Sequence, residues 1–167
     1  MSLVTNIATA YRAPRVAFRR ELGQLAEPRS LMIALLFCVL TYVSRMPEIA
    51  AISHLEGDDI DTRNGRYGAM FVSTILFAPL MMYFIAFLAH AVIRLFGGQA
   101  TWGEARLALF WAALASSPLV LISGALKVFS PGAPFLVAQL LTAVVFLWQW
   151  AACIAVAEFG ERVKEPA

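Results

Sequence analysis

The residues best suited to chemistry in this chain are polar side chains inside long apolar stretches. Gln139, Thr142 and Gln149 recur at helical spacing in one such stretch, so they would share one face of a helix. Amides in hydrocarbon need hydrogen-bond partners, which neighbouring helices or water can supply. The stripe therefore predicts either hydrogen bonds between packed helices or a polar groove for a lipid headgroup or a small solute. We favour packing, because these few polar groups are too sparse for a pathway across a membrane.

One ionisable side chain, His90, lies inside a second apolar stretch. An ionisable residue at membrane depth suggests a functional role. His90 stands only four residues before Arg94, near the expected end of its helix, where water and headgroups can also reach it. An ordinary interfacial histidine is therefore the alternative interpretation.

An acidic cluster lies between the first two apolar stretches, at Glu56, Asp58, Asp59 and Asp61. Asp59 and Asp61 resemble the start of a calcium loop, but an arginine and an asparagine occupy the fifth and sixth positions, where a ligand and a glycine are needed. We predict a solvated acidic loop, with weak binding of a divalent ion as the alternative. No cofactor is expected.

Composition indicates a membrane protein. Hydrophobic residues make up 60% of the chain and charged residues only 14%, against about 25% charged in ordinary soluble domains. Four apolar runs predict an all-α polytopic bundle over residues 28–160, with transmembrane helices at about 30–47, 68–95, 104–127 and 134–158. The two cysteines, Cys38 and Cys153, lie in apolar runs and are interpreted as small hydrophobic residues. A net charge of +2 gives no reason to expect nucleic acid binding.

The sequence of residues 1–27 predicts an amphipathic helix, either continuous or broken at Pro14, that lies in the headgroup layer. Its apolar residues follow at three- and four-residue steps, while four arginines lie off that stripe. A solvated arm or a partner-binding helix has the same pattern. Residues 161–167 form a short polar tail.

Basic residues predict the orientation of the bundle. With the N-terminus in the cytoplasm, nine Lys and Arg residues lie inside and four lie outside. The positive-inside rule therefore places both termini in the cytoplasm and the loop 46–66 outside.

The turn between the second and third spans has clear stop and start signals. Gly97 and Gly98 follow the last periodic residues of one helix, where a left-handed position favours glycine. Thr101 and Glu104 then predict a capping box at the start of the next helix. Arg106 lies in its first turns, and Pro118 is expected to kink it.

This hairpin, HAVIRLFGGQATWGEARLALFWAALASSPL at residues 90–119, resembles the bacterial branch of the Yip family. Arg45-Met46-Pro47 after the first span and the tryptophans Trp148 and Trp150 in the last span are also similar. The resemblance covers nearly the whole chain, from Tyr11 to about Glu158. It implies a multi-span protein of the bacterial inner membrane, related to eukaryotic proteins that interact with Ypt/Rab GTPases.

Enzyme signatures such as Gly-x-Ser-x-Gly, a Walker sequence or HExxH are not found, so catalysis is not expected. Two classes of function remain. The first is a non-catalytic scaffold or accessory subunit that organises membrane proteins or shapes the bilayer. The second is a conduit for a lipid or a small solute. The expected partners are membrane lipids and other integral membrane proteins or further copies of the chain.

Overall fold

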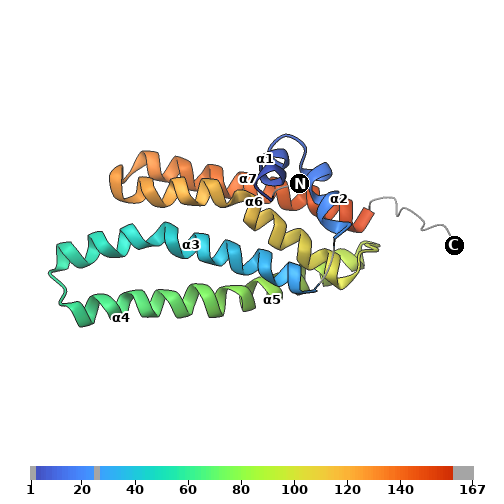
Figure 1. Ribbon diagram of the computed structural model, residues 1–167. Helices are drawn as coiled ribbons and strands as arrows, with labels where there is room; N and C mark the ends of the chain where they lie inside the picture. Colours follow the sequence, from blue (N-terminus) through green and yellow to red (C-terminus); the bar gives the residue numbers. More distant parts are fainter. Residues whose placement is uncertain (1–2, 25–26, 160–167) are drawn as a thin grey trace.

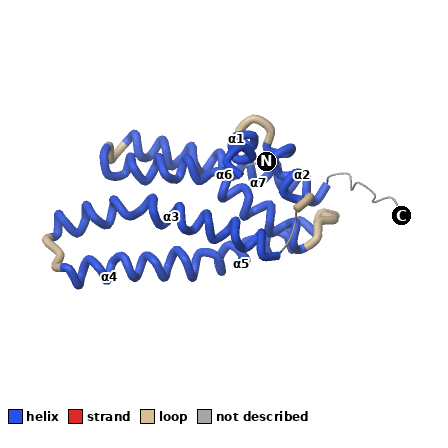
Figure 2. The backbone as a smooth tube through the Cα atoms, in the orientation of Figure 1, coloured by secondary structure: helices blue, strands red, loops and turns tan. Residues whose placement is uncertain are grey.

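The structure is a computed structural model that describes residues 3–24 and 27–159. All regular structure within those residues is helical, which confirms the predicted all-α class (Figure 2). The predicted tail, residues 161–167, lies outside the described residues.

Among the described residues, four helices are long and apolar enough to cross a membrane, as the sequence predicts. They are α3 (Glu27–Glu56), the continuous helix Ile60–Leu95, α6 (Trp102–Phe129) and α7 (Ala133–Phe159). The second of these consists of α4 (Ile60–Phe71), a π-helical segment η1 (Val72–Phe77) and α5 (Ala78–Leu95). The π-helical segment ends two residues before Pro79. The missing N–H of Pro79 cannot bond the carbonyl of Ile75, so the pattern of backbone hydrogen bonds shifts there.

The helices extend past the predicted spans, most of all at the first loop. α3 runs through Pro47 to Glu56, and α4 begins at Ile60 after the short turn at Gly57. The hairpin of α3 and α4 therefore projects beyond the hairpin of α6 and α7 (Figure 1). We call the end of the bundle at the α3–α4 and α6–α7 turns the distal end, and the opposite end, at the α5–α6 turn, the proximal end.

The N-terminal arm forms two short helices that pack on the bundle. α1 (Leu3–Ala10) and α2 (Pro14–Leu22) are separated at the predicted break, and Pro14 occupies the first turn of α2. Both helices contact α6. Phe18 is fully buried. The Glu21 carboxylate accepts from Asn6 of α1 at 2.7 Å and joins the arm to α3 through Arg29 at 2.8 Å. The apolar stripe of the arm therefore faces protein, and its arginine side faces outward.

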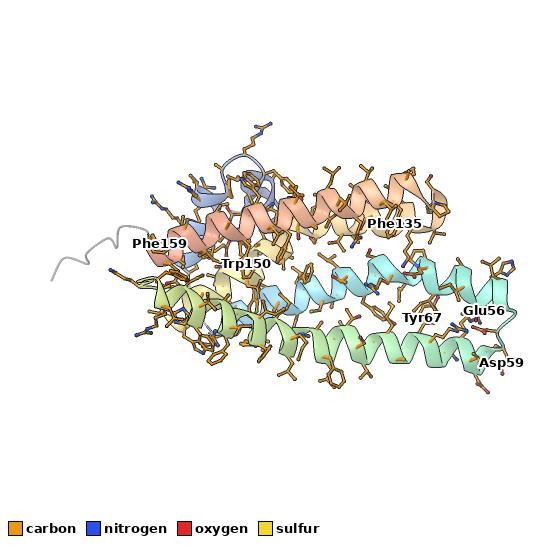
Figure 3. All side chains as sticks on the ribbon, turned by 180° about the vertical axis from the view of Figure 1, so that it is seen from behind. Glu56, Asp59, Tyr67, Phe135, Trp150 and Phe159 are labelled. Atoms are coloured by element: carbon orange, nitrogen blue, oxygen red, sulfur yellow. The ribbon has the colours of Figure 1, made fainter. Side chains whose placement is uncertain are left out.

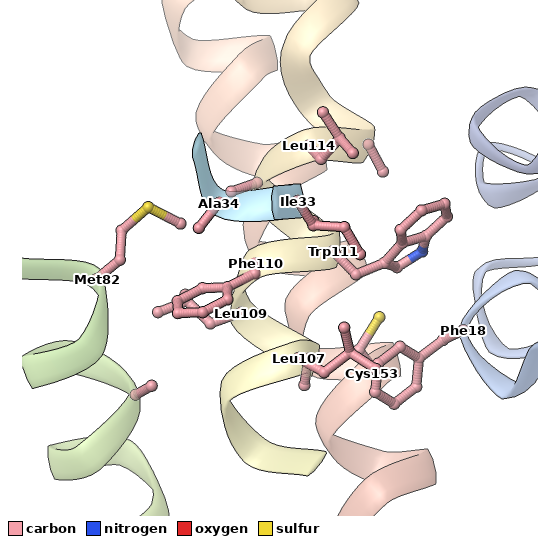
Figure 4. Close-up of a cluster of buried hydrophobic side chains, with 14 of the residues drawn as sticks. Phe18, Ile33, Ala34, Met82, Leu107, Leu109, Phe110, Trp111, Leu114 and Cys153 are labelled. Atoms are coloured by element: carbon pink, nitrogen blue, oxygen red, sulfur yellow. The ribbon is translucent and has the colours of Figure 1, made fainter. Parts of the chain in front are cut away.

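α6 is the central helix of the molecule. It contacts α1, α2, α3, α5 and α7, and it is the most buried of the four long helices. Its buried aromatic residues Phe110 and Trp111 pack with Ile33, Met82 and Cys153 from three other helices (Figure 4). The small residues Ala108, Ala112, Ser116, Ala113 and Ser117 are all buried, which is what close helix approach requires.

Candidate functional site

An open groove runs along α7. In its first two hollows α3 forms the opposite side and α6 the floor, and in its third hollow α5 lies opposite α7. The groove consists of three adjoining hollows of about 200, 450 and 360 Å³, from the distal to the proximal end. Gln139 and Thr142 line both the first and the second hollow, and Ile85 and Trp150 line both the second and the third. Figure 3 labels Phe135 and Trp150 at two depths along the α7 side of this groove.

The distal hollow is polar and charged. Arg45 and Glu48 line it from α3, and Lys127 lines it from α6. The Lys127 ammonium lies 2.6 Å from the Glu48 carboxylate and 5.7 Å from the centre of the Phe135 ring. Arg45 is exposed, and among the described residues no carboxylate pairs with it. This end of the groove therefore has two cations for one anion.

The two proximal hollows are apolar and aromatic. The middle hollow is lined by Phe37, Met82 and Phe146 around the polar edge formed by Gln139 and Thr142. The third hollow has only aliphatic side chains and the Trp150 ring: Ile85, Leu88, Ala89, Val92, Ile93, Trp150 and Ile154. The groove thus changes from polar to apolar along its length.

The residues of the predicted polar stripe in the fourth span lie in different surroundings. Gln139 is exposed and lies in the groove, and the Thr142 hydroxyl donates to the Ala138 carbonyl of its own helix at 2.8 Å. Gln149 is fully buried, and neither of its amide atoms has a hydrogen-bond partner. The favoured interpretation, hydrogen bonds from each glutamine to a neighbouring helix, is therefore wrong for the described structure.

Two polar residues of the first span face the same groove. Thr41 and Arg45 line the distal hollow opposite Gln139 and Thr142. The helix continues past Pro47, so Arg45 lies within α3. Cys38, one turn before Thr41, is buried, and both cysteines are free thiols. The short polar stripes of α3 and α7 therefore meet across one hollow.

At the proximal end, His90 is part of a buried polar cluster. Its Nδ1 lies 3.0 Å from the Glu158 carboxylate, and the other carboxylate oxygen accepts the backbone N–H of Ala100 at 2.8 Å. The Glu158 side chain is 1% exposed. The Trp102 ring covers the histidine, with ring centres 5.6 Å apart. This cluster joins α5, the α5–α6 turn and α7, so His90 has a structural partner rather than an open site.

The α5–α6 turn has the predicted stop and start signals. Gly97 has φ of 87°, and the N–H groups of Gly97 and Gly98 donate to the carbonyls of Arg94 and Ile93, as in a Schellman motif. Thr101 and Glu104 form the capping box. Gly98 has an ordinary φ, but a Cβ there would lie 2.5 Å from the Glu158 carboxylate.

Two further residues singled out from the sequence, Arg106 and Pro118, lie in α6. Arg106 pairs with Glu27 at the start of α3, and its guanidinium lies 5.5 Å from the centre of the Tyr83 ring. Pro118 lies inside α6, which continues through it to Phe129. Both residues are therefore part of the helix packing around the groove.

Glu158 is the site residue that sequence reasoning missed. The predicted fourth span ends at about Glu158, and the sequence pattern assigns this carboxylate no role. An acidic side chain in the last turn of an apolar span is itself a signal that it has a partner inside the protein. Ser44 and Gly124, where α3 and α6 touch, carry no comparable signal.

The acidic loop at the distal tip is occupied by ion pairs and a helix cap (Figure 3). Arg66 pairs with Glu56 and, at 2.7 Å, with Asp58. Asp59 caps α4, and hydrogen bonds from Thr62 hold the pKa of this carboxyl below its usual value. Over residues 3–24 and 27–159, no three His, Cys, Asp or Glu side chains gather closely enough to hold a metal ion.

Comparison with known families gives one match. The model of the Yip1 domain matches residues 8–160, which include the N-terminal arm from Ala8 onward and all four long helices. No match was found among curated proteins or among solved structures.

Proposed function

Since the chain belongs to the Yip1 domain family, we propose that it is a non-catalytic scaffold or accessory subunit that holds another integral membrane protein. Family membership and four apolar helices make it a multi-pass membrane protein. The proposal adds that its activity is binding within the membrane plane.

One observation carries the proposal: among the described long helices, α7 packs extensively only on α6. It packs on α6 along its length and on the short helix α2 at its proximal end. The side of α7 turned away from both α6 and the groove is exposed and apolar. We call it the outer face of α7, formed by Leu136, Leu140, Val144, Leu147 and Trp148. A transmembrane helix of another protein can pack along such a face without disturbing the bundle.

Photo-crosslinking in native membranes tests this proposal. A photoreactive residue at Leu140, on the outer face, should give discrete protein crosslinks. The control position is Phe84 on α5, which is similarly exposed and apolar. Adding Val144→Trp should lower the crosslink yield at Leu140, because the larger ring changes the packing surface. Lipid adducts alone at Leu140, with the same pattern at Phe84, would overturn the proposal.

For the location, we propose a bacterial inner membrane with both termini in the cytoplasm. The nine-to-four distribution of basic residues supports this orientation. Cysteine labelling of intact cells checks it, since the native Cys38 and Cys153 are buried and should react little. Asp59→Cys should react with an impermeant reagent from outside, and Arg15→Cys only after the membrane is opened. The reverse pattern would show the opposite orientation.

A second candidate function is a lipid or solute conduit, which the groove position of Gln139 and Thr142 favours. The third hollow argues against it, because that part of the groove has only apolar and aromatic lining. A headgroup moving toward the proximal end would meet no polar surface there. Vesicles containing the protein should therefore not scramble lipid; scrambling that Gln139→Leu abolishes would favour the conduit.

A further inference from the structure

We propose that the groove along α7 is a binding site for one glycerophospholipid, with the phosphate at Arg45 and the acyl chains in the apolar hollows. The site lies on a different side of α7 from the outer face. It goes beyond the scaffold function, because it assigns a small-molecule ligand to the protein itself.

The charges of the distal hollow fit a phosphate diester. Lys127 is already paired with Glu48, so the pair contributes little net charge. Arg45 remains as an exposed guanidinium that, among the described residues, contacts no carboxylate. A phosphodiester carries one negative charge and presents two oxygens, which match the two parallel N–H donors of a guanidinium. The ligand therefore supplies the anion that this hollow lacks.

Gln139 supplies hydrogen-bond donors for the ester groups next to the phosphate. The Thr41 and Thr142 hydroxyls donate to carbonyls of their own helices, at 2.9 and 2.8 Å, and Ser44 donates to the Val120 carbonyl at 2.9 Å. Gln139 makes no hydrogen bond among the described residues and faces the same hollow. Its amide N–H groups are thus available to the ester carbonyls that join the acyl chains to glycerol.

The depth of each part of the groove fits one leaflet of a bilayer. The polar part extends along α7 from Phe135 to Thr142, or about 10 Å at 1.5 Å per residue. The apolar part extends from Thr142 to Ile154, or about 18 Å. One leaflet has a headgroup layer of roughly 5 to 8 Å and a hydrocarbon layer of about 15 Å. A phospholipid, with a charged phosphate and apolar acyl chains, therefore matches both parts at once.

Native mass spectrometry of the purified full chain tests the headgroup contact. Titration with palmitoyl-oleoyl phosphatidylglycerol should give one retained lipid per chain. Arg45→Gln should weaken this binding about tenfold, the size expected for one charge-assisted hydrogen-bonded contact. The control Arg94→Gln removes an exposed arginine at the proximal end and should leave binding unchanged. Diacylglycerol with the same chains lacks the phosphate and should bind at least tenfold more weakly. Equal binding of the two lipids, or equal effects of the two arginine changes, would overturn the proposal.

A pair of adjacent tryptophan substitutions tests the acyl-chain contact. Ala143 lines the middle hollow, whereas the neighbouring Val144 belongs to the outer face. Ala143→Trp fills the hollow and should reduce phosphatidylglycerol retention at least tenfold. Val144→Trp should leave retention unchanged while it lowers protein crosslinking at Leu140. Loss of lipid retention in both variants, or in neither, would overturn the lipid site, and the crosslinking result judges the scaffold function separately.

Discussion

The Glu158 carboxylate in the last turn of α7 lies 3.0 Å from Nδ1 of His90, 68 positions earlier near the end of α5. The same carboxylate accepts the Ala100 N–H, and the Glu158 carbonyl accepts the Gln99 N–H at 3.2 Å. The proximal ends of α5 and α7 and the turn before α6 are thus held by one buried residue. α5 itself has few other contacts with α7, so this cluster closes the proximal end of the bundle.

Removing that carboxylate should destabilise the protein. Glu158→Ala leaves the Ala100 N–H and the His90 ring buried without a partner, which should lower the free energy of unfolding by about 2 to 3 kcal/mol. Glu158→Gln retains an amide oxygen that can accept the Ala100 N–H, so it should lower the free energy of unfolding by less. Unfolding in mixed detergent micelles, followed by circular dichroism, measures both variants. Equal stability of Glu158→Ala and the wild type would show that the cluster contributes nothing.

The two glycines of the α5–α6 turn should respond differently to substitution. Gly97 has φ of 87° with open space around it, so Gly97→Val is strained by its backbone while Gly97→Asn, which tolerates that region, should cost less. Gly98 is limited by space beside Glu158, so both valine and asparagine should be unfavourable there. Thermal stability in detergent checks this order. If Gly97→Asn and Gly97→Val lose the same stability, the positive φ is not what matters.

The cap at the start of α6 can be tested with two substitutions of the same residue. The Thr101 hydroxyl accepts from the Glu104 N–H at 3.4 Å, and the Glu104 carboxylate accepts from the Thr101 N–H at 2.6 Å. Thr101→Ala should cost about 1 kcal/mol, whereas Thr101→Ser keeps the acceptor and should cost little. The same unfolding assay measures both, and a loss as large for serine as for alanine would contradict a capping role.

The sequence predicts most of the fold because its signals are local. Hydrophobic length predicts the four long helices, and the residues of the turn from Gly97 to Glu104 predict its geometry. The break at Pro14 follows in the same way, because proline acts on its own backbone. Hydrophobic length predicts where a helix crosses the membrane but not how far it continues outside the hydrocarbon. α3 therefore continues through Pro47 although the predicted span ends there.

The candidate site is harder to predict, since it depends on which helices are neighbours. Spacing places Gln139 and Gln149 on one face, but it cannot say that α7 leaves α3 and opens a groove at Gln139 while Gln149 is enclosed. The role of Arg45 likewise depends on Lys127 and Glu48 being paired with each other. These are contacts between distant segments, and one sequence read by itself does not specify them.

The contact between α3 and α6 at Ser44 and Gly124 should be sensitive to a single methyl group. Ser44 donates to the Val120 carbonyl at 2.9 Å, and a Cβ at Gly124 would overlap the Ser44 backbone oxygen. Gly124→Ala should therefore cost about 1 to 3 kcal/mol, because backbone must move. Gly68→Ala, in the open part of α4, meets nothing within 4 Å and should be neutral or gain up to about 1 kcal/mol. Equal effects of the two changes would show that α3 and α6 are not in close contact there.

Leucine in place of each glutamine of α7 should reveal their different surroundings. Gln149 is fully buried with no partner for either amide atom, so its polar atoms are a cost to the folded state. Gln149→Leu should raise the free energy of unfolding by about 1 kcal/mol, since leucine has a similar volume and needs no partner. Gln139 is exposed in the groove, so Gln139→Leu should change stability by less than about 0.5 kcal/mol. Had both amides bonded neighbouring helices, each leucine would instead have lost about 0.6 kcal/mol. A loss for Gln149→Leu would therefore mean that a hydrogen-bond partner reaches this amide in the membrane.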